Sequence, residues 1–223
     1  MTNWDEQLIS FYNNLNPPQD LPGNINWLFP QKDPAVMKVV SQFLHKYYHD
    51  NKPRKLMLGI NPGRFGAGVT GVNFTAPKQL ETYCSIEHHF KKQTELSAEF
   101  IYEMIEGYGG VSKFYDDFFI GSVCPLGFVQ NGKNLNYYDD KLLLAAVEPF
   151  IIRNLQTLIN MNIDGRICFS IGGEKNYKYL VSLNKRFGWF QNIVALPHPR
   201  FIMQYRRKQK EEFIQRYLEL ITK

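Results

Sequence analysis

The sequence has few cysteines, no long hydrophobic run and no large excess of charge of one sign. Its three cysteines, Cys84, Cys124 and Cys168, are an odd number at wide spacing. They predict neither a disulfide framework nor an iron–sulfur cluster with four thiolate ligands. The longest aliphatic run covers residues 142–147 and is far shorter than the roughly 20 residues of a membrane-spanning helix. We therefore expect no membrane span.

The N-terminal residues are polar and lead into no apolar signal segment. Together with the sparse cysteines, this predicts a cytoplasmic protein. The 223 residues include 26 Lys and Arg against 21 Asp and Glu, a formal net charge of +5. Such a mild excess does not indicate a protein that coats nucleic acid, so the position of the basic residues matters more than their sum. Hydrophobic residues make up 44% of the chain, which is ample for a packed core and argues against disorder.

Short apolar runs alternate with longer segments of helical periodicity, and this pattern is typical of an α/β layer protein. Each apolar run ends at a cluster of Gly, Pro or Ser. The pattern predicts four buried parallel strands, over residues 55–60, 118–123, 166–171 and 193–196. It also predicts helices over residues 35–48, 97–108, 138–160, 174–187 and 203–221.

The length favours a single domain that covers residues 1–223. Residues 1–34 hold a short helical pattern followed by several prolines, and we expect them to form an extension packed on the core. Pro149 falls inside a predicted helix and should kink that helix or split it.

In an open parallel sheet, ligands bind beyond the carboxyl ends of the strands. Asn61 follows the first predicted strand and is fixed by Pro62, while His198 follows the last one between two prolines. Prolines leave such side chains little conformational freedom. Either residue alone is best explained by a local turn or a satisfied loop histidine. As a pair on adjacent loops, with Phe74 between them, they indicate a preorganised site.

Two other patterns point elsewhere and are rejected on context. Residues 66–71 read Gly-Ala-Gly-Val-Thr-Gly, which matches the dinucleotide-binding fingerprint letter for letter. That fingerprint must follow a strand at once and open a helix, and we expect residues 72–77 to be extended. Residues 84–89 contain one cysteine and two histidines, but a closed zinc site needs four ligands. We expect surface histidines near a half-buried thiol there, and no metal or cofactor.

The strongest resemblance to a known family lies in residues 59–66 and 70–74. They read Gly-Ile-Asn-Pro-Gly-Arg-Phe-Gly and Thr-Gly-Val-Asn-Phe. They resemble the first active-site motif of the single-strand-selective monofunctional uracil-DNA glycosylases, Gly-Met-Asn-Pro-Gly-Pro-Phe-Gly and Thr-Gly-Val-Pro-Phe, with the same internal spacing. This first motif is long enough to be specific.

Two further stretches follow in the same order. Cys-Pro-Leu at 124–126 and Gly-Lys-Asn-Leu at 132–135 are similar to that family's central Cys-Pro-Leu and Gly-Arg-Asn-Leu. His-Pro-Arg at 198–200 corresponds to its second active-site motif, His-Pro-Ser-Pro-Arg-Asn. The resemblance covers roughly residues 55–220. It implies a three-layer α/β/α sandwich around a central, mainly parallel four-stranded sheet, as in uracil-DNA glycosylases.

The resemblance also implies a role for each matching residue. Asn61 would orient the water that attacks C1′ of the deoxyribose, and His198 would donate a hydrogen bond to O2 of the departing base. Phe74 would stack on the flipped base. The pocket would further be lined by Ile60, Gly63, Phe65 and Ser122. Fixed donors aimed at O2 suit a leaving pyrimidine on which negative charge grows.

Residues 200–210 hold five basic residues and no acidic one, with apolar residues between them. This composition suits a wedge that fills the vacated base stack while cations hold the phosphates. We expect DNA contacts from Arg200, Arg206, Arg207 and Lys208. A solvated helix face is the alternative explanation for this charge run.

The chain also departs from the family pattern. Ser122 stands where the family has an Asn whose amide reads the Watson–Crick edge of uracil, so the pocket could prefer another deaminated base, such as xanthine. After His198 and Pro199 the second motif is altered as well. No lysine lies in the motif loops where a Schiff base would form, and Lys175 is expected in the first turn of a helix, so the reaction would leave an abasic site without a Schiff base.

The sequence therefore predicts a monofunctional DNA glycosylase that acts in base excision repair, with damaged DNA as its partner and no obligate protein partner. A DNA-binding module that keeps the fold without the activity is the first alternative, because Ser122 departs from the pattern. A dinucleotide-binding oxidoreductase is the second, based on the glycine pattern alone.

Overall fold

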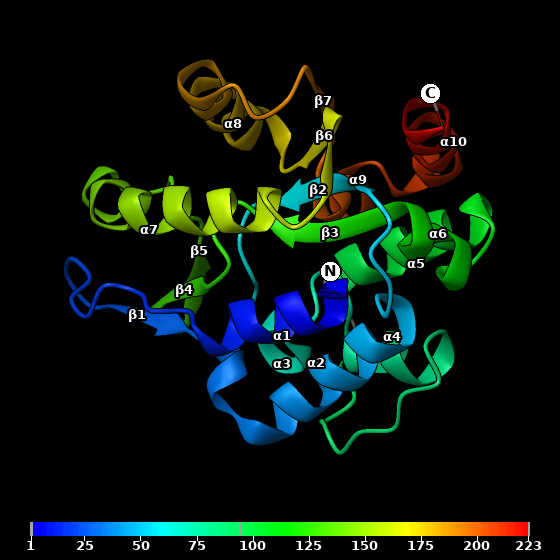
Figure 1. The fold of residues 1–223 in the computed structure, drawn as a ribbon, viewed down its shortest axis with the longest axis horizontal. Helices are drawn as coiled ribbons and strands as arrows, with labels where there is room; N and C mark the ends of the chain where they lie inside the picture. Colours follow the sequence, from blue (N-terminus) through cyan, green and yellow to red (C-terminus); the bar gives the residue numbers. More distant parts are fainter. Residues whose placement is uncertain (1, 94, 223) are drawn as a thin grey trace.

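The computed structural model describes residues 2–93 and 95–222, which form two sheets and the helices around them (Figure 1). The elements before the first strand of the larger sheet are α1 (Trp4–Asn13), β1 (Ile25–Leu28), the short 3₁₀ helix η1 (Pro30–Lys32) and α2 (Pro34–Tyr47). The middle of the chain forms β2 (Arg54–Gly59), α3 (Ala67–Thr70), α4 (Pro77–Thr82), α5 (Leu96–Tyr108), α6 (Val111–Asp117), β3 (Phe118–Ser122), β4 (Gly127–Gln130) and β5 (Lys133–Leu135). The remainder forms α7 (Lys141–Ile159), β6 (Ile163–Ile171), α8 (Gly173–Phe187), β7 (Asn192–Leu196), α9 (Pro199–Tyr205), η2 (Arg207–Gln209) and α10 (Lys210–Ile221).

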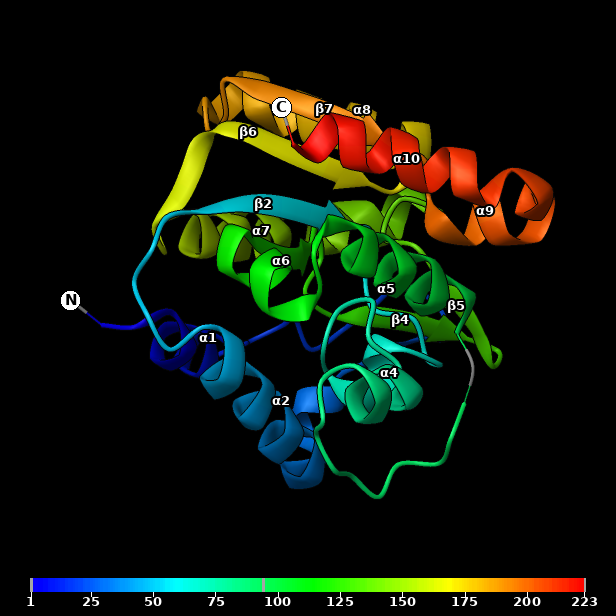
Figure 2. The same cartoon turned by 90° about the vertical axis from the view of Figure 1, so that its right-hand side faces the viewer.

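The larger sheet has four strands in the order β3-β2-β6-β7, and every pairing in it is parallel. These are the four predicted strands, with β6 and β7 starting slightly earlier than the sequence pattern indicated. Helices α7 and α8 cover one face, and α5, α6 and α10 cover the other (Figures 1 and 2). The predicted α/β fold around a central parallel sheet is confirmed.

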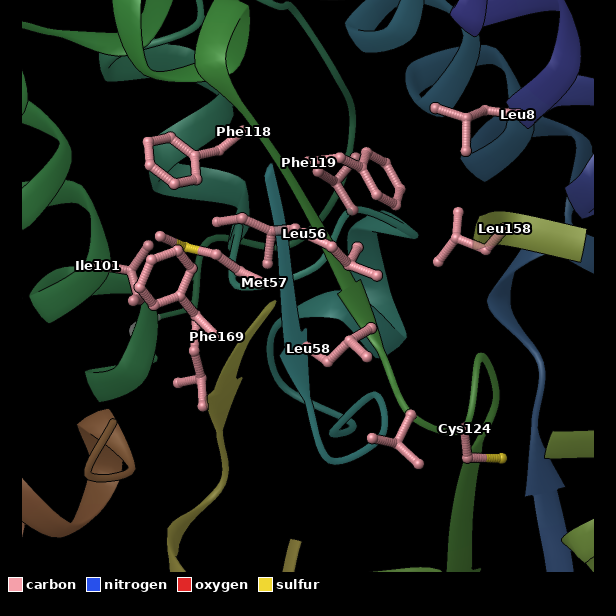
Figure 3. Close-up of a cluster of buried hydrophobic side chains, with 14 of the residues drawn as sticks. Leu8, Leu56, Met57, Leu58, Ile101, Phe118, Phe119, Cys124, Leu158 and Phe169 are labelled. Carbon is pink, nitrogen blue, oxygen red and sulfur yellow. The ribbon is translucent and has the colours of Figure 1, made fainter. Parts of the chain in front are cut away.

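Both faces of the central strand β2 are buried, which explains its unbroken apolar run. Leu56, Met57 and Leu58 have no solvent exposure. Figure 3 shows Phe118, Ile101 and Phe169 on one side of this strand and Leu8, Phe119 and Leu158 on the other. Parallel strands covered by helices on both sides read as continuous hydrophobic segments for this reason.

The N-terminal residues contribute directly to this core. Trp4 and Leu8 of α1 are fully buried, and the Trp4 ring lies 5.8 Å from that of Phe119. Strand β1 pairs with β4 in a second, antiparallel sheet of order β1-β4-β5. The sequence pattern did not predict this sheet, because its strands have only three or four residues and lie among turn-forming residues.

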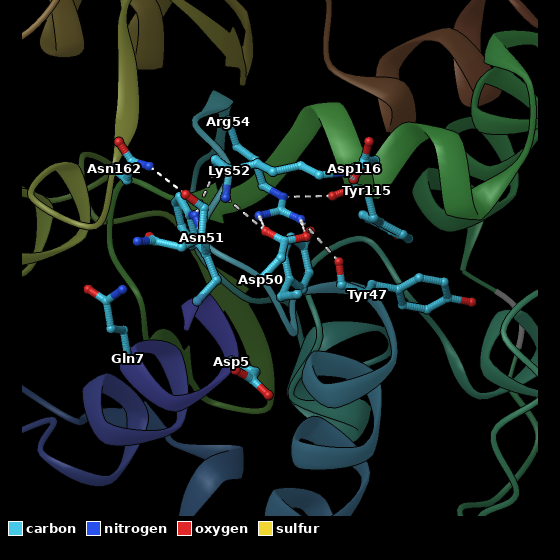
Figure 4. A network of polar contacts seen from close by, with 12 residues as sticks. Asp5, Gln7, Tyr47, Asp50, Asn51, Lys52, Arg54, Tyr115, Asp116 and Asn162 are labelled. Atoms are coloured by element: carbon cyan, nitrogen blue, oxygen red, sulfur yellow. Dashed lines mark hydrogen bonds and ion pairs between the residues drawn. The ribbon is translucent and has the colours of Figure 1, made fainter. Parts of the chain in front are cut away.

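A buried arginine fixes the start of β2. Arg54 is fully buried and pairs with Asp50 through both carboxylate oxygens, at 2.7 and 2.8 Å (Figure 4). Its guanidinium also donates to the backbone carbonyls of Tyr115 and Tyr47. A buried charge is tolerated when its hydrogen-bonding groups are satisfied in this way.

We expected Pro149 to kink or split its helix; α7 continues through the proline as one helix, so the split is wrong. Buried side chains on both sides of the proline, among them Val147 and Ile151, hold the two halves on the core. By length and composition α7 could also cross a membrane, with a mean hydropathy of 1.4, a feature that the short aliphatic runs had not predicted. Its buried side packs on β6, and the core helix of a folded domain passes the same test.

The predicted last helix over residues 203–221 is divided, in contrast to α7. Helix α9 ends at Tyr205, because Arg206 leaves the helical conformation with φ −132° and ψ 25°. Helix α10 then begins at Lys210. The apolar face of α10 packs on the core, with Ile214, Tyr217 and Ile221 buried.

Candidate active site

A cavity of about 440 Å³ opens where the strands of the parallel sheet end. Its size falls in the range of small-molecule sites. It is lined by residues from each of the four segments that follow or end the parallel strands, among them Asn61, Ser122, Gly172 and His198. The carboxyl edge of the sheet therefore forms the pocket that the strand pattern predicts.

Asn61 and His198 line the same pocket, although their loops are not adjacent. Strand β6 lies between β2 and β7, so the expectation of neighbouring loops was wrong. The pocket spans all three strand ends, since Gly172 directly after β6 lines it together with Asn61 and His198. Phe74 lies on this path, with its ring centroid 6.2 Å from that of His198.

The side chain of Asn61 is held at both ends by backbone groups. Its Nδ2 donates to the carbonyl oxygen of Leu135 at 3.0 Å, and its Oδ1 accepts from the N–H of Tyr137 at 3.1 Å. These partners fix which end of the amide is the oxygen. The second lone pair of Oδ1 is available to a ligand. Sequence reasoning identified Asn61 but not this anchor, which depends on the unpredicted strand β5.

His198 lies at the N-cap of α9 and is a neutral donor. The backbone N–H of Arg200 donates to its Nδ1 at 3.1 Å, so the ring hydrogen resides on Nε2. Burial, with a contribution from the charge of Arg200, lowers the pKa of His198 to about 4. At neutral pH the ring is therefore uncharged and can donate one hydrogen bond from Nε2.

Phe74 adopts a backbone conformation that is rare for a bulky residue, with φ 52°. Its ring packs over Gly59: a Cβ at that glycine would lie 2.7 Å from Cε2 of Phe74. Because Gly59 has no side chain, the Phe74 ring can pack directly on its backbone and line the pocket. This is the arrangement expected of a platform on which a planar ligand stacks.

Ser122 forms a side-chain pair that the sequence did not predict. Its hydroxyl donates to Oδ1 of Asn73 at 2.7 Å, and Asn73 also lines the pocket. The Nδ2 of Asn73 donates to the carbonyl oxygen of Ile120 at 3.4 Å. The pocket therefore contains the amide of Asn73 beside the hydroxyl of Ser122, which ends β3.

The other predicted pocket residues, Ile60, Gly63 and Phe65, all line the cavity. The Phe65 ring is 39% exposed at the rim and lies 4.6 Å from the Arg64 guanidinium carbon. The loop is closed by a hydrogen bond from the N–H of Gly68 to the carbonyl of Gly63 at 2.9 Å. A side chain at Gly68 would clash with that carbonyl.

This packing also explains the rejected glycine pattern. A single turn of helix, α3, begins directly after Gly66, inside the pattern. Gly71 ends it with φ 74°. The segment expected to be extended, residues 72–77, instead forms bends and turns up to the start of α4 at Pro77. The glycines therefore cap and pack a four-residue helix whose start lies several residues beyond β2, which is not the context of a dinucleotide site.

The basic segment is only partly at the pocket. Arg200 lines it, whereas Arg206, Arg207 and Lys208 do not, although all four are exposed. Lys210 pairs with Glu103 at 2.5 Å. Of the apolar residues between them, Ile202 and Met203 are buried, so they cannot form a wedge. The exposed aromatic rings are those of Phe201 and Tyr205, which lie 5.7 Å apart at the pocket rim.

The expectations for the Cys84 region need correction. Cys84 is fully buried rather than half-buried, and the side chain of His88 is 1% exposed and bonded to the Pro77 carbonyl. A different trio, Asp5, His45 and His49, brings possible metal ligands within 4.8 Å of one another. Burial alone would raise the pKa of Asp5, but hydrogen bonds from His49 and His45 and from the Glu6 N–H lower it below its ordinary value. None of these residues lines the pocket.

Sequence reasoning missed several residues of the pocket wall. Oδ1 of Asn134 accepts a hydrogen bond from the backbone N–H of Arg64 at 3.3 Å, and Tyr138 forms part of the wall. Glu95 contributes a carboxylate, whose Oε2 accepts from the Ala98 N–H at 2.7 Å and so caps α5. Only Asn134 had a sequence signal, since it falls in the second stretch similar to the glycosylases.

The comparisons with known proteins agree with this geometry. Residues 45–222 match the Uracil DNA glycosylase superfamily. The crystal structure of wild-type SMUG2 from Pedobacter heparinus superimposes with a TM-score of 0.95 at 43% sequence identity. The match covers 100% of this chain and 98% of that one. Among curated proteins, none matches. The chain belongs to the uracil DNA glycosylase superfamily.

Proposed function

We propose that this protein is a monofunctional DNA glycosylase that hydrolyses the N-glycosidic bond of uracil or another deaminated base in DNA. The observation that carries the proposal is the arrangement of a clamped amide (Asn61), a stacking ring (Phe74) and a neutral imidazole donor (His198) around one pocket that is large enough for a base. Membership of the superfamily supports the same reaction type. The product would be an abasic site, the substrate of the next step of base excision repair.

Asn61 acts by positioning. An amide cannot take a proton as a carboxylate can. With one lone pair of Oδ1 bonded to the Tyr137 N–H, the other can accept from a water and aim its oxygen at C1′. Because the amide is held at both ends, this water is ordered before the bond breaks.

His198 acts on the leaving group. As the glycosidic bond lengthens, negative charge develops on the pyrimidine and is largest on its carbonyl oxygens. A fixed donor stabilises that charge without reorganisation. The Nε2–H of a neutral histidine fits this role, and the hydrogen bond from Arg200 N–H to Nδ1 orients the ring.

The base must leave the stack to reach Phe74. Extrusion costs a few kcal/mol, which stacking in the pocket partly recovers. We expect the exposed rings at the rim, Phe201 and Tyr205, to contact the neighbouring bases. Arg200, Arg206, Arg207 and Lys208 would then hold the phosphates.

The reaction needs no Schiff base. None of the described residues that line the pocket is a lysine, so the simplest nucleophile is water. The preferred base stays a prediction, with uracil and xanthine as the candidates.

The proposal is tested with end-labelled oligonucleotides that carry one uracil, xanthine or hypoxanthine, single- and double-stranded, followed by alkaline cleavage of abasic sites. We expect cleavage at a modified base with the wild-type protein and a loss of at least about 100-fold with His198→Ala. DNA binding without cleavage of any substrate would instead indicate a binding module on a glycosylase fold.

A further inference from the structure

We infer that Asn73 fixes the hydroxyl of Ser122 so that its oxygen presents only an acceptor to the base, and that this acceptor distinguishes uracil from cytosine and hypoxanthine from adenine. The inference rests on the proposed function and extends it to the recognition of the base edge. It assigns Asn73 as a positioning residue and Ser122 as the group that contacts the base. Both line the pocket, and Ser122 is 8% exposed.

The geometry fixes the direction of the hydrogen bond. A serine hydroxyl alone can rotate, so that it donates to an acceptor or accepts from a donor. Here its hydrogen points at Oδ1 of Asn73, 2.7 Å away. The opposite orientation of the amide would direct Oδ1 at the carbonyl oxygen of Ile120, which instead accepts from Nδ2 at 3.4 Å. The Ile120 carbonyl therefore sets the amide, and the amide sets the hydroxyl.

With its hydrogen committed, Ser122 Oγ has only lone pairs to offer a ligand. A base is then bound well only if its edge places an N–H against this oxygen. Uracil carries a hydrogen on N3, where cytosine has a bare acceptor nitrogen. Hypoxanthine carries one on N1, where adenine has an acceptor. Xanthine also presents N–H groups.

A fixed acceptor thus detects the hydrogen that deamination of cytosine or adenine adds. Placing the bare nitrogen of cytosine against the lone pairs of Ser122 would leave two acceptors facing each other. An unmatched buried polar group is more costly than a lost hydrogen bond. In this pocket the amide of Asn73 does not contact the base itself. It affects base discrimination by orienting the hydroxyl of Ser122.

The test uses single-stranded oligonucleotides with one 2′-fluoro-2′-deoxyuridine or 2′-fluoro-2′-deoxycytidine, because the fluorine disfavours the oxocarbenium-like state and allows binding without cleavage. The ratio of the two dissociation constants is measured for the wild type, Asn73→Leu, Asn73→Asp and Ser122→Ala. Leucine keeps most of the volume without an acceptor, whereas aspartate keeps an oxygen for the serine hydroxyl. Asn13→Leu, at an exposed position of α1, is the matched control.

We expect the wild type to prefer the uridine oligonucleotide. Asn73→Leu should reduce this preference about tenfold, the effect of roughly one hydrogen bond, and Ser122→Ala should reduce it equally. Asn73→Asp should retain the preference, as should Asn13→Leu. The double variant of Asn73→Leu and Ser122→Ala should lose no more than either single one, since both act at one contact.

An unchanged preference in Asn73→Leu would overturn the inference, and so would a loss in Asn73→Asp as large as in Asn73→Leu. Uracil excision by the wild-type protein is measured in parallel. Excision with an unchanged preference would refute the role of Asn73 while the glycosylase stands. Preferential binding without excision by the wild type would refute the proposed reaction alone.

Discussion

Several side chains in the pocket are held by close backbone contacts rather than by other side chains. The Phe74 ring packs on the backbone of Gly59. The Leu135 carbonyl and the Tyr137 N–H bond the side chain of Asn61. The Arg200 N–H donates to Nδ1 of His198 and orients its ring. Such contacts depend on the path of the chain far from each residue in sequence. The residue types of the site could be predicted from the sequence, but their partners could not.

The contact between Gly59 and Phe74 makes a specific prediction. In Gly59→Ala the new methyl group would displace the Phe74 ring, because its position lies 2.7 Å from Cε2. We expect single-turnover base excision to fall about 100-fold, the cost of a misplacement of roughly 1 Å. Gly107→Ala in α5, where a Cβ would meet the side-chain ends of Leu218 at 3.0 Å and Ile214 at 3.9 Å, lies away from the pocket and should keep its rate. Equal rates for the two variants would show that Phe74 does not need its present position.

His198 should make the stability of the protein depend on pH. Its pKa is lowered to about 4 in the folded protein from the ordinary 6.5, so the unfolded state binds the proton first. The free energy of unfolding therefore falls as the pH drops from about 6.5 towards 4. In His198→Asn this contribution is absent, and we expect the urea midpoint to change less between pH 7 and pH 5. A variant with the same pH dependence as the wild type would contradict a lowered pKa for His198 in the folded protein.

At the level of helices and strands, the four parallel strands could be predicted because each is an apolar run that ends at a turn-forming residue. The antiparallel sheet could not, since β1, β4 and β5 are short and are stabilised by pairing with one another. The break between Tyr205 and Lys210, which divides α9 from α10, was also missed because the helical periodicity of the sequence continues across it.

Helix α10 should matter for the active site without touching it. The hydroxyl of Tyr217 donates to the carbonyl of Pro197, the residue before His198, and Tyr217 is fully buried. Tyr217→Phe removes this donor and leaves the carbonyl unsatisfied. We expect a loss of about 1 kcal/mol in the free energy of unfolding and a lower kcat at nearly unchanged KM. Chemical denaturation and steady-state kinetics measure the two effects, and an unaltered kcat would show that α10 does not position the His198 loop.

At the level of the whole molecule, the N-terminal residues, the β2 start and the sheet form one packed unit. Trp4 lies 5.6 Å from the guanidinium of Arg54, which in turn pairs with Asp50. A buried arginine at the first position of a parallel strand is not expected from hydrophobic patterning, because its hydrogen-bond partners come from separate segments. Only the three-dimensional structure brings Asp50 and the two tyrosine carbonyls to it.

This unit predicts a large effect from a single substitution. Asp50→Ala leaves the fully buried Arg54 without its carboxylate, and we expect a loss of about 3 kcal/mol in the free energy of unfolding. The double variant Asp50→Ala and Arg54→Met has no unpaired charge and should be more stable than the single one. Urea denaturation of both variants decides this, and a single variant as stable as the wild type would refute the coupling.

The central claim is that the pocket around Asn61, Phe74 and His198 releases a base from DNA. The most direct measurement is the amount of free uracil, quantified by mass spectrometry, after incubation of a uracil-containing single strand with the wild-type protein and with Asn61→Ala. We predict stoichiometric or greater release by the wild type and a strongly reduced rate for the variant. Release that is equal in the two proteins would contradict the assignment of this pocket as the catalytic site.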